Sequence, residues 1–227
     1  MSSTLSPSVG WAVLHLFCKL TPALDADAVC AAIKTAGEDD HQVIPFSVLG
    51  HKADLGVMAL GSDWVRLRRL QADLSGAGLA VVDSYVSLTE VSEYAQGMPA
   101  ERLEVRLHPR LPPDGKRAYC FYPMSKRRGE SDNWYALDFD ARKELMLDHG
   151  RSGRRFSDRV VQLITGSTGL DAFEWGVTLF ATHPDDLKDT VYTMRFDEAS
   201  TRYAEFGPFY SGIVGDIDEV LALVGPR

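Results

Sequence analysis

The chain has 227 residues, 45% hydrophobic and 25% charged, with a formal net charge of −8. This composition is typical of an ordinary globular protein large enough for one domain or two of roughly 110 residues, and the acidic balance argues against nucleic acid as a partner. The opening Met-Ser-Ser-Thr-Leu-Ser has no charged start, and nowhere do 18 apolar residues follow one another, so we expect a cytoplasmic protein without a membrane span.

The cysteines give a second indication of compartment. Cys18, Cys30 and Cys120 show no C-x-x-C spacing, and an odd number is a poor disulfide framework. We therefore expect three reduced structural thiols.

The first half of the chain is predicted to alternate strands and helices. We expect a strand at 11–17, a helix at 25–36, two strands within 42–60, a helix at 64–74 and a strand at 84–88. The first helix is indicated by an apolar stripe of Val29, Ala32, Ile33 and Ala36. The predicted order is β, α, β, β, α, β.

A second half of similar pattern follows a predicted linker, Leu-Pro-Pro-Asp-Gly at 111–115. We expect strands at 118–122, 160–165, 175–181 and 209–214, and helices at 138–148 and 184–197. Two tandem ferredoxin-like halves, residues 1–111 and 116–227, are the simplest α+β arrangement. The repeat is one of pattern, because the halves show no strong residue identity.

Basic residues are concentrated in one third of the chain. Residues 101–160 hold 14 Lys or Arg and 10 Asp or Glu, a balance of +4, so the remaining residues carry −12. A local positive field in an acidic protein suits a small polyanion with several carboxylates better than a phosphate backbone. Taken alone, the same clustering would also fit a solvated loop.

Three short motifs inside or beside this basic region point to one chemistry. They are Tyr122-Pro-Met-Ser-Lys-Arg-Arg128, Asn133-Trp-Tyr135 and Asp148-His-Gly150. Ferric iron binds a neutral imidazole, porphyrin propionates pair with Lys and Arg, and a phenol can carry a one-electron hole. The motifs together therefore indicate haem chemistry.

The phenol and the ammonium are expected to face one cavity. Pro123 favours an extended conformation at Tyr122 and is expected to end regular pairing there, so the phenol can point into a cavity. Lys126 then falls in a turn-like segment, where its ammonium can pair with a carboxylate and supply a proton. The ordinary alternative for Tyr122 is a core or edge tyrosine.

His149 is the candidate iron ligand. The predicted helix begins after Asp138, a cap, and stops at Gly150, and His149 follows Leu145 and Met146 on its apolar face. The ordinary alternative is a hydrogen-bonded core histidine. The other five histidines form no close ligand pair, so a non-haem metal site is less attractive.

The chain as a whole resembles the coproheme decarboxylases of the chlorite dismutase-like superfamily. The resemblance is dense from about residue 107 to 211 and thinner at 10–20 and 84–94. Besides the three motifs above, it rests on Gln162, Gly166-Ser-Thr-Gly169, Glu174-Trp-Gly-Val-Thr-Leu-Phe180 and Met194-Arg-Phe-Asp-Glu-Ala-Ser-Thr-Arg-Tyr203.

The resemblance implies an oxidoreductase of haem biosynthesis. Enzymes of this family use hydrogen peroxide to convert two propionates of iron coproporphyrin III (coproheme) to vinyl groups, giving haem b, so the substrate is its own redox cofactor. By motif, His149 is the axial iron ligand, Tyr122 the radical-bearing residue and Lys126 a catalytic partner for the second propionate. The implied substrate-contacting residues are Arg106, Tyr122, Pro123, Met124, Ser125, Lys126, Gln162 and Ser200.

The resemblance also implies an assembly and an order of events. The two halves form a dimeric α+β barrel, subunits join in a homopentamer, and a coproporphyrin ferrochelatase is a transient partner. Two carboxylates are not expected to reach Tyr122 at once. A three-propionate intermediate should therefore re-orient before the second step.

Gln162 separates this chain from true chlorite dismutases, which have an arginine at the matching position. A neutral amide cannot hold a chlorite-derived anion with full charge, so chlorite chemistry should be weak. Arg110 is the alternative to Arg106 as a propionate partner. Arg195 and Arg202 are expected to form ion pairs with Asp197, Glu198 or Glu205.

Three other functions remain open from the sequence. A haem b peroxidase or chlorite-decomposing relative would keep His149 but ignore the propionates, and a haem carrier or sensor would bind without turnover. A cofactor-free barrel of the related monooxygenase type would have no use for His149.

Overall fold

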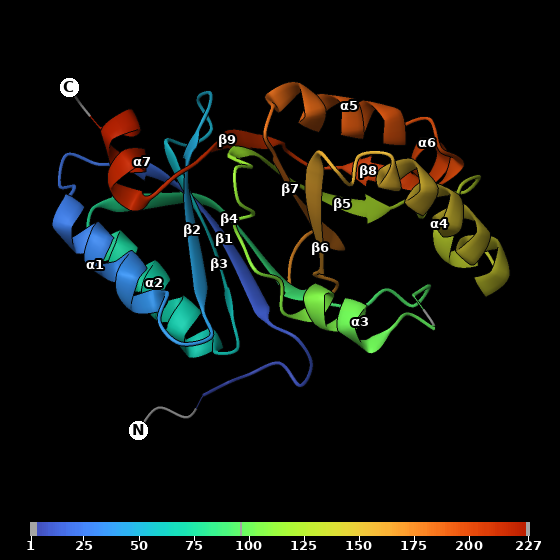
Figure 1. The fold of residues 1–227 in the computed structure, drawn as a ribbon, viewed down its shortest axis with the longest axis horizontal. Coiled ribbons are helices and arrows are strands. Elements are labelled where there is room, and N and C mark those ends of the chain that lie inside the picture. The colour runs from blue at the N-terminus through green and yellow to red at the C-terminus, as the bar shows by residue number, and fades with distance from the viewer. Residues whose placement is uncertain (1–3, 96, 226–227) are drawn as a thin grey trace.

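The computed structural model describes residues 4–95 and 97–225, and the first half forms one four-stranded antiparallel sheet with helices on its outer face (Figure 1). Residues 1–3, which begin the segment on which the expected cytoplasmic location partly rests, lie outside this description. The sheet order is β4-β1-β3-β2. The elements are β1 (Ala12–Leu20), α1 (Ala26–Ala36), β2 (Gln42–Val48), β3 (Leu55–Gly61), α2 (Trp64–Gly76) and β4 (Leu79–Thr89).

The second half repeats this order as β9-β5-β7-β6, with β8 continuing beside the end of β5. Its elements are α3 (Ala100–Leu107), β5 (Ala118–Lys126), the 3₁₀ turn η1 (Trp134–Ala136), α4 (Phe139–Arg154), β6 (Val160–Gly166), β7 (Trp175–Ala181), α5 (Pro184–Met194), α6 (Glu198–Tyr203), β8 (Ala204–Phe206), β9 (Tyr210–Val214) and α7 (Ile217–Val224). Both halves have the strand order of a ferredoxin-like unit.

The two sheets close into one barrel through two short seams. β2 pairs with β9 at one seam, and β4 pairs with β6 at the other. A Cβ on Gly212 would collide with the Ser47 carbonyl oxygen, so the first seam needs glycine at this position. The predicted α+β barrel is confirmed, whereas the division into domains at 1–111 and 116–227 stays a prediction.

The barrel interior is a single apolar core built by both halves. Phe46 of the first half stacks on Tyr119 of the second with ring centroids 3.9 Å apart, and Tyr119 meets Phe180 at 5.5 Å. Outside the barrel, α1 and α2 cover the first sheet, and α7 crosses back to join them through Val220 (Figure 1). Each half therefore depends on the other for part of its buried surface.

Four local expectations were wrong or incomplete. β5 continues past Tyr122 to Lys126, because β7 and β8 still pair with the strand there. α4 runs through Gly150 to Arg154, because Gly150 does not adopt the left-handed conformation that stops a helix. The helix predicted at 184–197 ends at Met194, and Asp197 caps a new helix, α6. The short helix α3 was not predicted.

Throughout the ranges 4–95 and 97–225, no helix is long and apolar enough to cross a membrane.

Substitution of Phe46 by Ala tests the shared core. We expect a loss of about 3–5 kcal/mol in the free energy of unfolding, because the fully buried ring leaves a cavity. The whole chain should still unfold in one transition, measured in urea by near-ultraviolet and far-ultraviolet circular dichroism. Phe196→Ala, at a ring that is 72% exposed, is the control. Separate transitions for the two halves would contradict the shared core.

Candidate functional site

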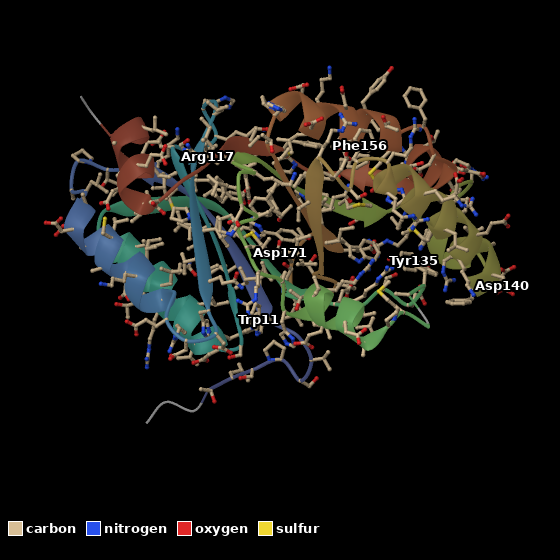
Figure 2. The ribbon with its side chains drawn as sticks, viewed as in Figure 1. Trp11, Arg117, Tyr135, Asp140, Phe156 and Asp171 are labelled. Carbon is tan, nitrogen blue, oxygen red and sulfur yellow. The ribbon has the colours of Figure 1, made fainter. Side chains whose placement is uncertain are left out.

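A cavity of about 450 Å³ lies beside the second sheet, on the side covered by α4, α5 and α6. Its wall is formed by β5, β6, β7, these helices, α3 and the segment after β4. Figure 2 labels Tyr135, one of the lining residues, beside α4. Seven of the predicted site residues line this cavity: Arg106, Tyr122, Met124, Lys126, His149, Gln162 and Ser200.

The alternation of β5 decides which residues of the Tyr122 motif reach the cavity. Tyr122, Met124 and Lys126 share the face that lines it. Pro123 and Ser125 occupy the other face, so their side chains are not among the lining residues. The Ser125 hydroxyl accepts a hydrogen bond from the Glu174 amide instead, at 3.2 Å. Geometry therefore does not support substrate contacts by these two side chains.

Tyr122 is a buried phenol held by aromatic rings. It is 7% exposed and stacks on Phe209 with ring centroids 4.5 Å apart and an interplanar angle of 23°. Burial raises the pKa of Tyr122 well above its usual value. The group is therefore a neutral phenol at physiological pH, with both its proton and an electron available.

Lys126 is a buried lysine rather than a residue of an exposed turn. Its Nζ donates to the Ala199 carbonyl at 3.1 Å and lies 4.2 Å from the centre of the Trp134 ring. Burial lowers the pKa of Lys126 from 10.5 to about 8, against the raising effect of Asp197 and Glu174. The group can therefore exchange a proton near neutral pH.

His149 is oriented by a buried carboxylate. Its Nδ1 lies 3.0 Å from Asp197 Oδ2, and the Asp197 side chain is 2% exposed. Burial alone raises the pKa of Asp197, but hydrogen bonds from His149 and from the Ser200 amide and hydroxyl outweigh it and hold the pKa below the usual range. Because the Asp197 carboxylate accepts a hydrogen bond from the Nδ1–H group, the neutral ring keeps its lone pair on Nε2.

Asp197 also places Ser200. As the cap of α6, its Oδ1 accepts from the Ser200 amide at 2.9 Å, and its Oδ2 accepts from the Ser200 hydroxyl at 3.3 Å. The helix cap is thus Asp197, and the Ser200 hydroxyl lies at the cavity wall. Met146 also lines the cavity, so His149 does lie on the apolar side of α4.

The remaining predicted residues differ in whether they line the cavity. Gln162 lines the cavity from β6, with Nε2 3.8 Å from the Met194 sulfur. Arg106 lines it from α3, and Arg110 does not. Arg202 pairs with Glu198 at 2.9 Å, as expected, and with Asp132.

Arg195 was assigned wrongly from the sequence. It lines the cavity and lies 4.8 Å from the centre of the Phe206 ring, and no ion pair is found for it within the described ranges. Trp175, Met194 and Glu90 are further lining residues that sequence reasoning missed. The Glu90 carboxylate accepts a hydrogen bond from the Trp175 indole at 3.1 Å. Trp175 and Met194 belong to the motifs Glu174-Trp-Gly and Met194-Arg-Phe, and this membership was the available signal for them.

The cavity wall carries three cationic side chains that can pair with an anionic ligand. Arg106, Lys126 and Arg195 come from three different elements, whereas Glu90 and Glu93 come from the single segment after β4. The wall also includes apolar side chains of β6, β7 and α5, among them Ile164, Val177 and Val191. The arrangement suits a flat apolar ligand with carboxylates at its edge and one atom that accepts an imidazole.

Comparisons with known proteins agree on the family. The family model described as chlorite dismutase matches residues 24–215. A coproheme decarboxylase of Staphylococcus carnosus is 36% identical over 94% of this chain and 95% of its own length. A protein of Natronomonas pharaonis, provisionally named as heme-binding, is 46% identical over 74% of this chain, which spans 30% of that longer relative.

Solved structures show the same architecture. A structure described as a novel heme-binding protein from Thermus thermophilus superimposes with a TM-score of 0.85 at 36% identity, covering 99% of this chain and 98% of the other. Chlorite dismutase from Candidatus Nitrospira defluvii gives a TM-score of 0.76 at 17% identity, with 95% of each chain covered. At that identity the second comparison supports the fold alone.

The buried ammonium of Lys126 predicts an unusual dependence of stability on pH. Its folded pKa is about 8 and its unfolded pKa 10.5, so the unfolded chain binds more protons between these values and stability rises with pH there. Replacement by Met removes this effect. The stability difference between Lys126→Met and the parent protein should therefore change by on the order of 2–3 kcal/mol between pH 7 and pH 10.5.

Urea unfolding of both proteins across this pH range measures the effect. Lys188→Met, at a side chain that is 77% exposed, is the matched control and should leave the pH profile unchanged. Parallel profiles for Lys126→Met and the parent protein would contradict burial of a charged lysine.

Proposed function

The chain belongs to the chlorite dismutase family, and from this premise we propose that it is a hydrogen peroxide-dependent coproheme decarboxylase. It converts two propionates of iron coproporphyrin III to vinyl groups and releases haem b. The observation that carries the proposal is that Tyr122, Lys126 and His149 line a single cavity. The full-length similarity to a curated coproheme decarboxylase supports it.

The cavity residues fit an iron porphyrin with carboxylates. His149 offers one axial nitrogen, fixed by Asp197 through the other, as metal-binding histidines usually are. Cationic groups stand at the cavity wall for the propionates, and the apolar side chains of β6, β7 and α5 accommodate the macrocycle. When bound, the iron of the substrate reacts with hydrogen peroxide and supplies the oxidising equivalents.

The overall reaction balances for each propionate. A propionate side chain, one hydrogen peroxide and one proton give a vinyl group, one carbon dioxide and two water molecules. The side chain loses two electrons and its carboxylate carbon, and the peroxide O–O bond takes up those two electrons. Protein groups therefore need to remove one hydrogen from the propionate, accept it and deliver a proton to the oxygen being reduced.

Tyr122 is proposed to remove that hydrogen. Its buried phenol gives up an electron and its proton together, because the phenolate is disfavoured in this apolar setting. The resulting neutral radical abstracts a hydrogen from the β-carbon of the nearest propionate, and the phenol is restored. A second one-electron oxidation of the substrate then releases carbon dioxide.

Lys126 is proposed to serve the second propionate. Its ammonium pairs with a carboxylate at the cavity wall and, with a pKa of about 8, can also donate a proton. Only one propionate fits beside Tyr122 at a time. A three-propionate intermediate therefore forms and re-orients before the second loss.

The remaining wall residues hold the substrate. Arg106 and Ser200 are proposed to bind propionates, and Gln162 lies where a neutral amide can hydrogen-bond to bound peroxide. Because residue 162 is a neutral glutamine rather than a cationic residue, chlorite chemistry should be weak. The peroxidase and carrier alternatives stay as outcomes of the tests below.

The cellular setting is part of the proposal and rests on the family resemblance. We infer a cytoplasmic homopentamer in coproporphyrin-dependent haem biosynthesis. A coproporphyrin ferrochelatase is the proposed transient partner that delivers the substrate.

Tyr122→Phe tests the radical step. The variant should bind iron coproporphyrin III but remove neither carboxyl group, because the phenylalanine ring has no O–H hydrogen to transfer. Stoichiometric hydrogen peroxide titration with porphyrin mass as the readout measures this. The parent protein should pass through the three-propionate species to haem b. Bleaching without mass change in the parent protein would favour the peroxidase or carrier alternative.

Lys126→Met tests whether Lys126 acts specifically in the second carboxyl loss. The first carboxyl loss should continue, while the second slows by about tenfold or more and the three-propionate species accumulates. Lys188→Met provides the surface control in the same mass assay. Equal slowing of both steps would refute a specific role of Lys126 in the second.

A further inference from the structure

Glu174 is a buried carboxylate at the back of the candidate site that the proposed mechanism does not use. It immediately precedes β7, and its side chain is 7% exposed. Burying an ionised carboxylate costs several kcal/mol unless partners compensate it. The groups that contact Glu174 therefore indicate its role.

The first set of partners is the end of β5. Glu174 Oε2 accepts from the Lys126 amide at 2.8 Å in a buried hydrogen bond. The Glu174 amide lies 3.1 Å from the Met124 carbonyl oxygen and 3.2 Å from the Ser125 hydroxyl. One residue thus holds the last three residues of β5 through its side chain and its backbone together.

The second set is the segment that follows β5 and returns to the cavity wall. Glu174 Oε1 lies 3.7 Å from an Arg128 guanidinium nitrogen, and burial together with Glu174 raises the pKa of the Tyr135 hydroxyl. Tyr135 and its neighbour Trp134 both line the cavity, and Trp134 lies under the Lys126 ammonium. The carboxylate therefore joins the end of β5 to Arg128, in the segment that carries these two aromatic side chains.

We propose that Glu174 is the positioning residue for Lys126, which keeps its ammonium charged and aligned on Trp134 for the loss of the second carboxylate. The inference rests on the proposed function of Lys126. Glu174 is not among the residues that line the cavity, and it acts through β5 and the segment of Arg128 and Tyr135.

The electrostatic part of this role follows from the charged groups that face the Lys126 ammonium. Asp197, which caps α6, and Glu174, ahead of β7, are the carboxylates whose charge raises the pKa of Lys126 against burial. Arg128 offsets part of the Glu174 charge from a side chain that is 67% exposed. Removing the Glu174 charge therefore shifts the Lys126 equilibrium towards the neutral amine.

Glu174→Gln is the test, because an amide oxygen can still accept the Lys126 N–H bond while the charge is lost. In the peroxide titration, the first carboxyl loss should stay within about threefold of the parent protein, and the second should slow by about tenfold. The pH at which the second loss declines should also fall by about one unit. Glu205→Gln, at a 59% exposed carboxylate near Arg127, is the matched control and should change neither step.

A readout without porphyrin separates this inference from the proposed function. In urea unfolding, the rise of stability with pH that begins near the Lys126 pKa should start at lower pH in Glu174→Gln by the same unit. An unshifted stability profile, or equal slowing of both carboxyl losses, would overturn the inference and leave Glu174 a purely structural group. Failure of the parent protein to lose any carboxyl group would overturn the proposed function instead, while the unfolding experiment would still decide whether Glu174 controls Lys126.

Discussion

The pairing of β5 on both its edges is the constraint on which the rest of the structure depends. β7 pairs along one edge from Ala118 to Met124, while β9 and then β8 pair along the other. Pairing on both edges fixes the orientation of β5 about its own axis. Its alternating side chains therefore point to two fixed faces. Tyr119 and Phe121 fill the barrel interior, and Tyr122 and Lys126 face the cavity. Barrel closure and the geometry of the site have the same physical cause.

The site combines this rigid strand with charged groups that are costly to bury. Lys126, Glu174 and Asp197 are each less than a tenth exposed, and each is compensated by a partner from another element. Asp197 fixes the tautomer of His149 from the helix side, and Glu174 holds β5 from the sheet side. Under the proposed function, such an arrangement sacrifices stability to hold the proton-donating Lys126 and the nitrogen of His149 that would bind iron in fixed positions.

Much of this was predictable from the sequence, for identifiable reasons. Apolar periodicity predicted both sheets, and the motif residues Tyr122, Lys126, Gln162 and His149 do meet in one cavity. The extension of β5 past Pro123 was not predictable locally, because it depends on pairing with β7 and β8, which lie far along the chain. α3 was missed because it is only eight residues long and buries none of them. Arg195 and Glu174 looked like ordinary charged residues, and only their packing gives them a place in the site.

A crystal structure of the protein with iron coproporphyrin III bound would test the central claim most directly. We predict His149 Nε2 bonded to the iron, Asp197 still on Nδ1, and one propionate beside the Tyr122 hydroxyl within reach of Lys126. A porphyrin bound outside this cavity, or an iron ligated by another residue, would contradict the claim.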